Sequence, residues 1–279
     1  MLIDSHAILG EGPRWDAATG RLLWVDIFGC RLHVFDPERG RDRPIELDAM
    51  PGVAVPMSDG RVLLGLADRL AAIDLDDESV QTLVAMPHGP DMRMNDGNCD
   101  AAGRLWIGSL ELEFAPHRGT LYRFDGELVP VLRDVTLSNG IGWTPDGTQM
   151  YFVDTLTYGI DVLDFDVDAG TVANRRRFAT IERGDGVPDG LCVDDEGGVW
   201  IALYGGAAVR RYDADGALDR HVAVPAENVT SCAFGGGRLF ITSAAPDGRV
   251  FVHEPGLSGP PAQVFRSTAP SAAEPTSAA

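Results

Sequence analysis

The stretch Arg93-Met94-Asn95-Asp96-Gly97, together with the following Gly103-Arg104-Leu105-Trp106-Ile107, decides the fold of this 279-residue chain. A polar, turn-forming signature leads, eight residues after Asn95, into a glycine that ends a turn, and an apolar strand follows at once. Two further copies have the same spacing: Leu137-Ser138-Asn139-Gly140 before Gly147, and Val187-Pro188-Asp189-Gly190 before Gly197. The shared spacing predicts that Asn95, Asn139 and Asp189 occupy equivalent points of a repeated unit.

A turn glycine followed by an apolar strand recurs six times, roughly every 40 to 50 residues, which is the spacing of propeller blades. These glycines are Gly20, Gly60, Gly103, Gly147, Gly197 and Gly237. No segment shows a sustained helical period of 3.6, whereas short β-branched and aromatic runs alternate with Gly, Pro and Asp turns. The sequence therefore predicts an all-β fold, a six-bladed β-propeller of four-stranded blades.

The two ends of the chain have different predicted roles. Residues 2–8 have the same phase as the outer-strand candidates that precede the later units, such as residues 80–85, so the N-terminal strand is expected to close the last blade. We expect residues 1–266 to form a single propeller domain. The small, Pro-rich residues 267–279 have the composition of a disordered tail.

Composition argues against several classes of partner. A net charge of -19 opposes binding to nucleic acid or to an anionic membrane, because phosphates require cationic neutralisation. No stretch approaches the length of a membrane span, and the N-terminus lacks the features of a signal peptide. The four cysteines show no CxxC pairing and the six histidines no HxxxH spacing. The sequence thus favours a cytoplasmic protein with free thiols and without a histidine-based zinc site.

Counting back from each turn glycine gives the residue that each blade places at one level around the propeller axis, here called the ring position. The count is eight residues in five units and nine in the first, whose turn at residues 16–20 is taken to be one residue longer. The six residues are Glu11, Gly52, Asn95, Asn139, Asp189 and Val229. Asn-Gly and Asp-Gly are common in ordinary turns, but turn chemistry does not explain four oxygen-bearing residues in one register. Two carboxylates buried close together repel unless a cation neutralises them. This all-oxygen set suits Ca²⁺, Mg²⁺ or Mn²⁺ better than a thiophilic metal, and predicts a divalent cation site.

Further polar residues surround the ring. Arg93 lies on the same side of its strand as Asn95, and Glu113 could be its ionic partner, unless the two belong to a loop surface where such pairs are common and weak. Asp26 and Asp154 could orient the ligands or tie down turns, and for Asp26 we favour the second role. The recurring Trp24, Trp106 and Trp200 are expected in the core.

Taken together, several short segments resemble those of the senescence marker protein-30 (regucalcin), gluconolactonase and sugar lactonase family. They are Leu9-Gly10-Glu11-Gly12-Pro13, Arg93-Met94-Asn95-Asp96-Gly97, Ser138-Asn139-Gly140, Pro188-Asp189-Gly190 and Phe234-Gly235-Gly236. The resemblance covers residues 9–244 and implies a six-bladed propeller with one divalent cation: calcium, magnesium, manganese or zinc, of which the oxygen donors favour calcium. It implies metal ligands at Glu11, Asn139 and Asp189, an acid/base role for Asp189, and substrate contacts at Arg93, Asn95 and Glu113.

The activity that this resemblance implies is hydrolysis of a small sugar-acid lactone, of the gluconolactone or pentonolactone type, to the aldonic acid. Two alternatives stay open from the sequence. One is a calcium-dependent organophosphate or aryl-ester hydrolase, because diisopropyl-fluorophosphatase-like propellers resemble this chain in their Glu, Asn, Asn, Asp ring. The other is a non-catalytic calcium-binding regulatory propeller.

Overall fold

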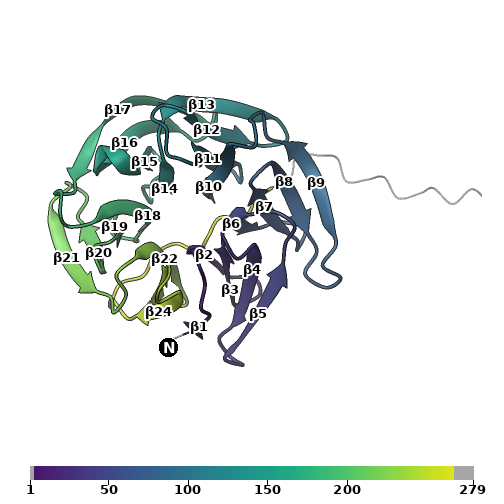
Figure 1. Cartoon of the computed structure of the whole chain (residues 1–279). Coiled ribbons are helices and arrows are strands. Elements are labelled where there is room, and N and C mark those ends of the chain that lie inside the picture. The colour runs from purple at the N-terminus through teal and green to yellow at the C-terminus, as the bar shows by residue number, and fades with distance from the viewer. Residues whose placement is uncertain (1–2, 267–279) are drawn as a thin grey trace, which may run out of the picture.

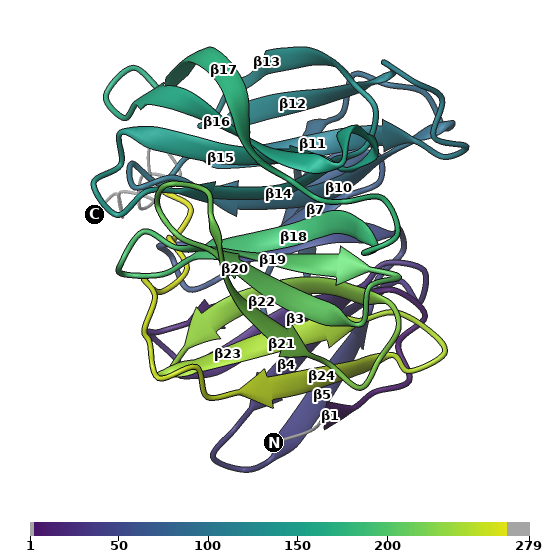
Figure 2. The ribbon, with the colours of Figure 1, turned by 90° about the vertical axis from the view of Figure 1, so that its left-hand side faces the viewer.

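Six four-stranded antiparallel sheets surround a central axis as the blades of a propeller (Figures 1 and 2). The computed structural model describes residues 3–266, and the expected disordered tail at 267–279 lies outside the described residues. Within the described part, the only helix is the short 3₁₀ element η1 (Thr155–Thr157). None of the described helices has the length and apolar character needed to cross a membrane. The predicted all-β, six-bladed fold is confirmed.

Each blade begins with an inner strand beside the axis and continues outward along the chain. Blade 1 contains β2 (Gly10–Asp16), β3 (Arg21–Asp26), β4 (Arg31–Asp36) and β5 (Arg41–Glu46), and blade 2 contains β6 (Pro51–Pro56), β7 (Val62–Leu66), β8 (Arg69–Ile73) and β9 (Val80–Ala85). Blade 3 contains β10 (Met92–Cys99), β11 (Leu105–Glu111), β12 (Gly119–Phe124) and β13 (Leu128–Val135), and blade 4 contains β14 (Ser138–Trp143), β15 (Gln149–Asp154), β16 (Gly159–Asp166) and β17 (Thr171–Thr180). Blade 5 contains β18 (Val187–Val193), β19 (Val199–Tyr204), β20 (Ala208–Tyr212) and β21 (Leu218–Ala223).

The sixth blade combines the two ends of the propeller. It contains β22 (Val229–Gly235), β23 (Arg238–Ser243), β24 (Arg249–His253) and the N-terminal β1 (Ile3–Asp4). Strand β1 pairs antiparallel with β24, with Ile3 opposite Val250 and Asp4 opposite Arg249. The predicted closure by an N-terminal outer strand is therefore confirmed.

The apolar core is divided into six clusters, one between each pair of neighbouring blades. Sheets pack face to face through such clusters because each sheet must bury its apolar surface against another. Trp24, Trp106 and Trp200 are fully buried in three of them, as expected. All four cysteines are free.

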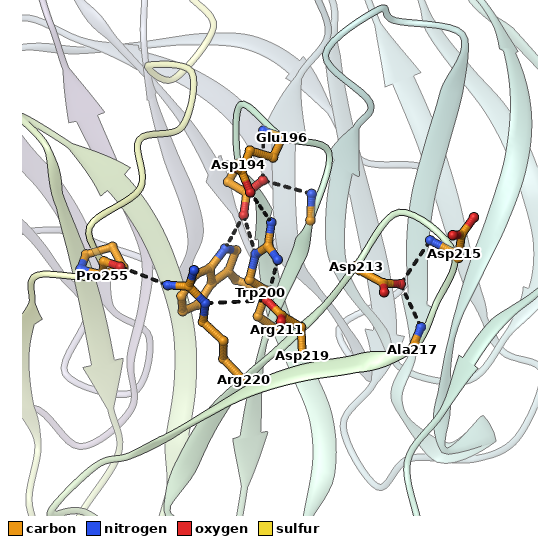
Figure 3. A network of polar contacts seen from close by, with 11 residues as sticks. Asp194, Glu196, Trp200, Arg211, Asp213, Asp215, Ala217, Asp219, Arg220 and Pro255 are labelled. Carbon is orange, nitrogen blue, oxygen red and sulfur yellow. Dashed lines mark hydrogen bonds and ion pairs between the residues drawn. The ribbon is translucent and has the colours of Figure 1, made fainter.

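Buried carboxylates anchor two of these tryptophans to the turn after the inner strand. In blade 5, Asp194 accepts hydrogen bonds from Trp200 Nε1 (2.8 Å) and Arg211 Nε (2.6 Å), and Arg211 also bridges to Asp219 (Figure 3). Burial opposes the charged form of Asp194, but the bonds from Arg211 and Trp200 hold its pKa below the usual range. In blade 3, Asp100 accepts from Trp106 Nε1 (2.9 Å) in the same way. These paired charges stabilise the blades without forming part of the ring.

The segment that follows β24 crosses one end of the propeller (Figure 1). Ser258 bonds to Asp195 of blade 5, and Phe265 bonds through its backbone to Pro56 and Ser58 of blade 2. The Phe265 ring is buried and stacks on Phe124, with 5.5 Å between centroids. Residues 258–266, called the C-terminal strap below, therefore pack against the end of the propeller at which the inner strands terminate.

The closing strand supports a stability prediction with a matched control. Ile3 of β1 is buried against Val250, whereas Ile8, in the following segment, is 53% exposed. Ile3→Ala is expected to lower the free energy of unfolding by about 2 kcal/mol, because a buried aliphatic side chain is lost. Ile8→Ala should change it by less than about 0.5 kcal/mol. Urea unfolding of both variants measures the difference, and equal effects would contradict a closing role for β1.

Candidate metal and catalytic site

All six inner strands have an irregularity at the same level. The ladder between the first and second strands slips between Glu11 and Arg14 in blade 1 and between Met94 and Gly97 in blade 3, and equivalent slips occur in the other four blades. A β-bulge inserts an extra residue and re-aims the local side chains. The bulges therefore explain why the side chains at this level do not alternate regularly between the two faces of the sheet.

The strand register confirms four of the six expected ring positions, Gly52, Asn95, Asn139 and Asp189, each of which follows the last pair before the shift. In blade 1, Glu11 itself forms that last pair, with Val25, so it lies one residue before the equivalent position, Gly12.

In blade 6 the expected residue is also displaced by one. Phe234 pairs with Leu239 across a turn one residue shorter than the equivalent turn of blade 2, where Pro56 pairs with Val62. Counting from the turn glycine therefore placed Val229 at the ring, whereas the register places Thr230 there. The Thr230 hydroxyl donates to the carbonyl oxygen of Gly10 at 2.5 Å, so it joins blade 6 to blade 1.

Gly52 occupies the bare ring position for a steric reason. A Cβ built on Gly52 would lie 2.4 Å from the backbone oxygen of Asn95, well inside van der Waals contact. Blade 3 thus approaches blade 2 too closely for a side chain at this point.

A continuous chain of hydrogen bonds joins the predicted substrate residues to a predicted metal ligand. Arg93 Nη1 donates to Asn95 Oδ1 at 2.7 Å, and Asn95 Nδ2 donates to Asn139 Oδ1 at 3.1 Å. Asn139 Nδ2 in turn donates to Thr155 Oγ1 of η1 at 2.9 Å. Because all three predicted residues are buried, these bonds fix their orientation at the axis.

Two carboxylates, Glu11 and Asp189, complete the group. Both are at least 94% buried, with exposed fractions of 5% and 6%. Burial, and then the negative charge of Asp96, raises the pKa of Glu11 to about 8. Burial, and then the charge of Glu11, raises the pKa of Asp189 well above its ordinary value. Asp189 Oδ1 has no hydrogen-bond partner, so the site contains an unsatisfied carboxyl oxygen.

These residues fit a divalent cation of the hard class. Among residues 3–266, no group of three or more His, Cys, Asp or Glu side chains could hold a metal ion, so carboxylates alone do not form a site. The amide oxygens of Asn139 and Asn95 extend the two carboxylates to a larger oxygen set, which calcium accepts. A cation here would offset the mutual repulsion that raises the pKa values of both carboxyl groups.

The raised pKa of Glu11 gives stability a pH dependence in chelator-treated protein. The pKa of this carboxyl group is ordinarily 4.5 and is about 8 in the folded protein. Between pH 4.5 and pH 8, the folded protein therefore retains a proton that the unfolded chain has released. The contribution of Glu11 to the free energy of unfolding should therefore be most favourable below about pH 4.5. It should become less favourable as the pH rises toward 8. Urea unfolding at several pH values with EDTA measures this slope. The slope should be reduced by excess calcium and in Glu11→Gln, and an unchanged slope in that variant would contradict the assignment.

One ion pair near the ring was not foreseen. Arg14 Nη2 lies 3.1 Å from Asp96 Oδ1, and both side chains are almost fully buried. Arg14 Nη2 also donates to the Gly97 carbonyl at 2.6 Å, so the pair joins blade 1 to blade 3 past the bare position of Gly52. No local sequence pattern marks a contact between residues so far apart, although both flank ring residues.

Glu113 forms none of the hydrogen bonds of the Arg93–Asn95–Asn139 chain. It is exposed in the loop after β11, where its backbone N–H donates to Glu111 Oε2 at 2.9 Å. Within the described part of the chain, no ion pair joins it to Arg93, whose guanidinium instead lies 5.9 Å from the centroid of Phe28. A substrate contact by Glu113 stays a prediction. Asp26, as expected, ties down turns by accepting from the N–H groups of Leu9 (2.9 Å) and Gly29 (3.0 Å).

The loops at the ring end of the propeller expose apolar side chains. Phe28 and Leu156 follow the second strands of blades 1 and 4, and Tyr204 ends the second strand of blade 5; all three are 38–52% exposed. Burial raises the pKa of Tyr204, and the carboxylates of Asp189, Glu227 and Glu11 raise it further, which places its hydroxyl within their field. The polar ring is therefore approached across a partly apolar rim.

The geometry defines a class: a six-bladed propeller with a buried group of oxygen-bearing side chains at its axis. Residues 9–245 match the family model of the SMP-30/Gluconolactonase/LRE-like region, and the chain belongs to this family. It is 36% identical to the putative sugar lactone lactonase YvrE of Bacillus subtilis (strain 168), covering 86% of this chain and 85% of the relative. It is 38% identical to the pentonolactonase XacC of Haloferax volcanii, covering 88% and 85%.

A solved structure has the same fold over nearly the whole chain. The calcium-binding protein regucalcin from Agrobacterium tumefaciens superimposes with a TM-score of 0.92 at 28% identity, covering 95% of this chain and 97% of that one. The predicted family is thus confirmed.

Proposed function

We propose that this protein is a divalent-cation-dependent lactonase that opens sugar-acid lactones to aldonic acids. The observation that carries the proposal is the buried pair Glu11 and Asp189, with its unsatisfied oxygen, beside the Arg93–Asn95 hydrogen bond. Relatives named as a sugar lactone lactonase and a pentonolactonase support the substrate class. The structural relative described as calcium-binding supports calcium as the cation.

In this proposal Glu11, Asn139 and Asp189 hold the cation. When bound, the cation supplies Lewis-acid polarisation of the lactone carbonyl. Asp189 Oδ1 accepts a proton from the attacking water as the water oxygen bonds to the carbonyl carbon. The carbon–oxygen bond of the ring then breaks, and the same carboxyl returns the proton to the departing ring oxygen. The products are the carboxylic acid and the free hydroxyl of the aldonic acid.

Arg93, Asn95 and Glu113 bind substrate in this proposal. Arg93 keeps its charge although burial lowers its pKa to about 10, because Glu11 and Asp189 act in the opposite direction. Sites that hydrogen-bond a substrate's hydroxyls discriminate strongly against analogues that lack them. The Arg93 guanidinium and the Asn95 amide are therefore suited to a polyhydroxylated ring.

Arg93→Ala is expected to raise KM for a sugar lactone about tenfold, with a smaller change in kcat, because a charged hydrogen bond to substrate is worth about 1.5–3 kcal/mol. Arg118→Ala is the matched control, since its side chain is 56% exposed and pairs with Asp91. Steady-state kinetics of both variants measure the effect. A loss confined to kcat would contradict a binding role for Arg93.

The apolar rim favours a second candidate, hydrolysis of aryl esters or organophosphates, because Phe28, Leu156 and Tyr204 could contact a less polar substrate. A pH-stat assay distinguishes the candidates, with gluconolactone, pentonolactones, phenyl acetate and a phosphofluoridate, each with and without EDTA. Acid release from the sugar lactones that EDTA abolishes is the expected result. Release only from the ester or phosphofluoridate would support the second candidate. Calcium binding without any turnover would support a regulatory propeller.

A further inference from the structure

A cleft between blades 1 and 2 gathers positive charge in a protein whose net charge is -19. Its volume is about 260 Å³, and four arginines, two aspartates and two aliphatic residues line it. The arginines are Arg21, Arg39, Arg41 and Arg43. The walls come from the turns that join β2 to β3 and β4 to β5, and from the segment after β8. The cleft therefore lies at the end of the propeller that the C-terminal strap crosses, opposite the ring.

The strand register places three of these arginines on one face of blade 1. Arg21 of β3, Asp36 of β4 and Arg41 of β5 form one row across the sheet, because the adjoining residues of β3 and β4 are paired and Asp36 is paired with Arg41. Arg43, two residues further along β5, is opposite Val34, which packs in the core cluster that blades 1 and 2 share. Residues directly opposite, or two apart on one strand, point to the same face. The three side chains therefore point toward blade 2.

These side chains are close together and accessible. Adjacent strands are about 4.8 Å apart, so the Cα atoms of Arg21 and Arg41 are separated by about 10 Å, a gap that two arginine side chains can span from both sides. Arg43 Nη2 donates to the Leu75 carbonyl at 2.9 Å, so the arginine face reaches the opposite wall. Arg21 is half-buried, whereas Arg41 and Arg39 are exposed. A dissolved ligand can therefore contact the guanidinium groups.

Two of the four arginines have no ionic partner. Within residues 3–266, no hydrogen bond or ion pair involves the side chain of Arg21 or Arg41. The carboxylates beside Arg21 in the sheet are instead bound by their own turns: Asp36 Oδ1 accepts from two backbone N–H groups, and Asp16 accepts from an N–H and a hydroxyl group. Arg21 and Arg41 are thus uncompensated by any contact.

Equivalent arginines in the next two blades differ in this respect. Arg61 and Arg104, like Arg21, directly follow a turn glycine. Arg61 Nη2 lies 2.7 Å from Asp59 Oδ2, and Arg104 Nε lies 2.7 Å from Asp100 Oδ2. In blades 2 and 3 the turn aspartate therefore neutralises this arginine, whereas in blade 1 the guanidinium stays available to an external anion.

The charge balance indicates the kind of anion. Arg39 and Arg43 have carboxylate partners at 3.5 and 3.6 Å, which leaves the two positive charges of Arg21 and Arg41. One exposed carboxylate on the wall, Asp76, opposes them. A guanidinium group donates two parallel N–H bonds to phosphoryl oxygens, and a phosphomonoester carries close to two negative charges at pH 7. A phosphoryl dianion therefore matches the two uncompensated cations in charge and in geometry.

We propose that this cleft binds a phosphoryl dianion, carried by a small phosphomonoester or present as free phosphate, with Arg21 and Arg41 as the principal donors. Leu75 and Val34 supply an apolar wall for a carbon substituent. The site goes beyond the proposed function, because it lies opposite the ring and its occupation requires neither the cation nor lactone hydrolysis.

Three probes test the proposal by calorimetric titration of the calcium-loaded full chain: phenyl phosphate, phenyl sulfate and inorganic phosphate. The first two share a shape and differ by about one negative charge at pH 7.5. We expect saturable binding of phenyl phosphate, with phenyl sulfate at least fivefold weaker, because the second negative charge is lost. Weaker binding of inorganic phosphate than of phenyl phosphate would identify the ligand as a phosphomonoester, and equal or tighter binding would identify it as free phosphate.

Four variants locate the site. Arg21→Gln and Arg41→Gln should each weaken phenyl phosphate binding about tenfold, because each removes a charged donor. Asp76→Asn should strengthen it about threefold, because it removes the opposing charge. Arg238→Gln is the matched control: Arg238 also follows a turn glycine, is half-buried and has no ion pair within residues 3–266, but it does not line the cleft. Its replacement should change the affinity less than twofold, and thermal unfolding verifies that each variant is folded.

Several results would overturn the proposal. Absence of saturable binding of phenyl phosphate at millimolar concentrations would show that the arginines are only solvated. Equal binding of phenyl sulfate would contradict the charge argument. Undiminished binding by both Arg21→Gln and Arg41→Gln would place the anion elsewhere, and loss of that binding in EDTA would place it at the ring cation instead.

Discussion

Replacement of Asp189 by Asn is expected to lower kcat for a sugar lactone by about 10³-fold or more, since a positioned acid/base group contributes 10²–10⁴-fold. The amide keeps the shape of the side chain and an oxygen donor, but it cannot accept and return a proton. The buried Oδ1, which has no partner in the protein, is the atom whose chemistry the substitution removes. Steady-state kinetics at saturating calcium measure the loss.

The control for this prediction is Asp168→Asn, which removes a carboxylate from an exposed turn between β16 and β17 and should leave kcat unchanged. Calcium affinity is measured in parallel, because Asp189 has two proposed roles. If Asp189→Asn retained more than a tenth of the wild-type kcat when saturated with calcium, the acid/base role would be wrong and only the ligand role would stay a prediction.

Replacement of Glu11 by Gln is expected to have opposite effects with and without calcium. Calcium affinity should fall by about 100-fold, because the number of charged ligands sets the affinity of oxygen sites. In EDTA at pH 7, however, the variant should be more stable than the wild type by about 1 kcal/mol or more. Folding buries the neutral glutamine directly, whereas Glu11, whose pKa is raised to about 8, must first take up a proton. Calorimetric calcium titration and urea unfolding measure the two effects.

Glu46→Gln is the matched control for this second prediction. Glu46 is exposed on β5 and pairs with Arg31, so its replacement should alter neither calcium affinity nor the pH dependence of stability. If Glu11→Gln lowered the free energy of unfolding in EDTA, Glu11 would be a structural group. If the variant left the calcium affinity unchanged, Glu11 would not be a ligand of the cation.

Much of the fold could be predicted because each blade is a local unit. The turn glycines and apolar strands recur within 40 to 50 residues, and β1 shares the phase of the other outer strands. The ring position of blade 6 was misplaced, because a count along the sequence cannot detect a turn that is one residue shorter. Only the pairing of Phe234 with Leu239 shows that Thr230, not Val229, lies at the ring.

The site was predictable to the extent that it repeats. Asn95, Asn139 and Asp189 share a register, and the structure brings the Arg93–Asn95–Asn139 chain together at the axis. Glu11 lies one residue before the equivalent position of blade 1. The Arg14–Asp96 pair has no such signal, because its partners belong to blades 1 and 3 and meet only when the ring closes. The C-terminal strap reaches blades 2 and 3 and packs there through contacts such as that of Phe265 with Phe124. No periodic pattern in the sequence predicts these contacts.

The most direct test of the proposed function is a titration of calcium into chelator-treated protein while gluconolactone hydrolysis is followed in a pH-stat. Turnover should be absent without calcium, return in proportion to added cation, and reach its maximum at one equivalent per chain. Turnover that persists in EDTA, or calcium binding at one equivalent that restores no hydrolysis of any lactone, would contradict the proposed function.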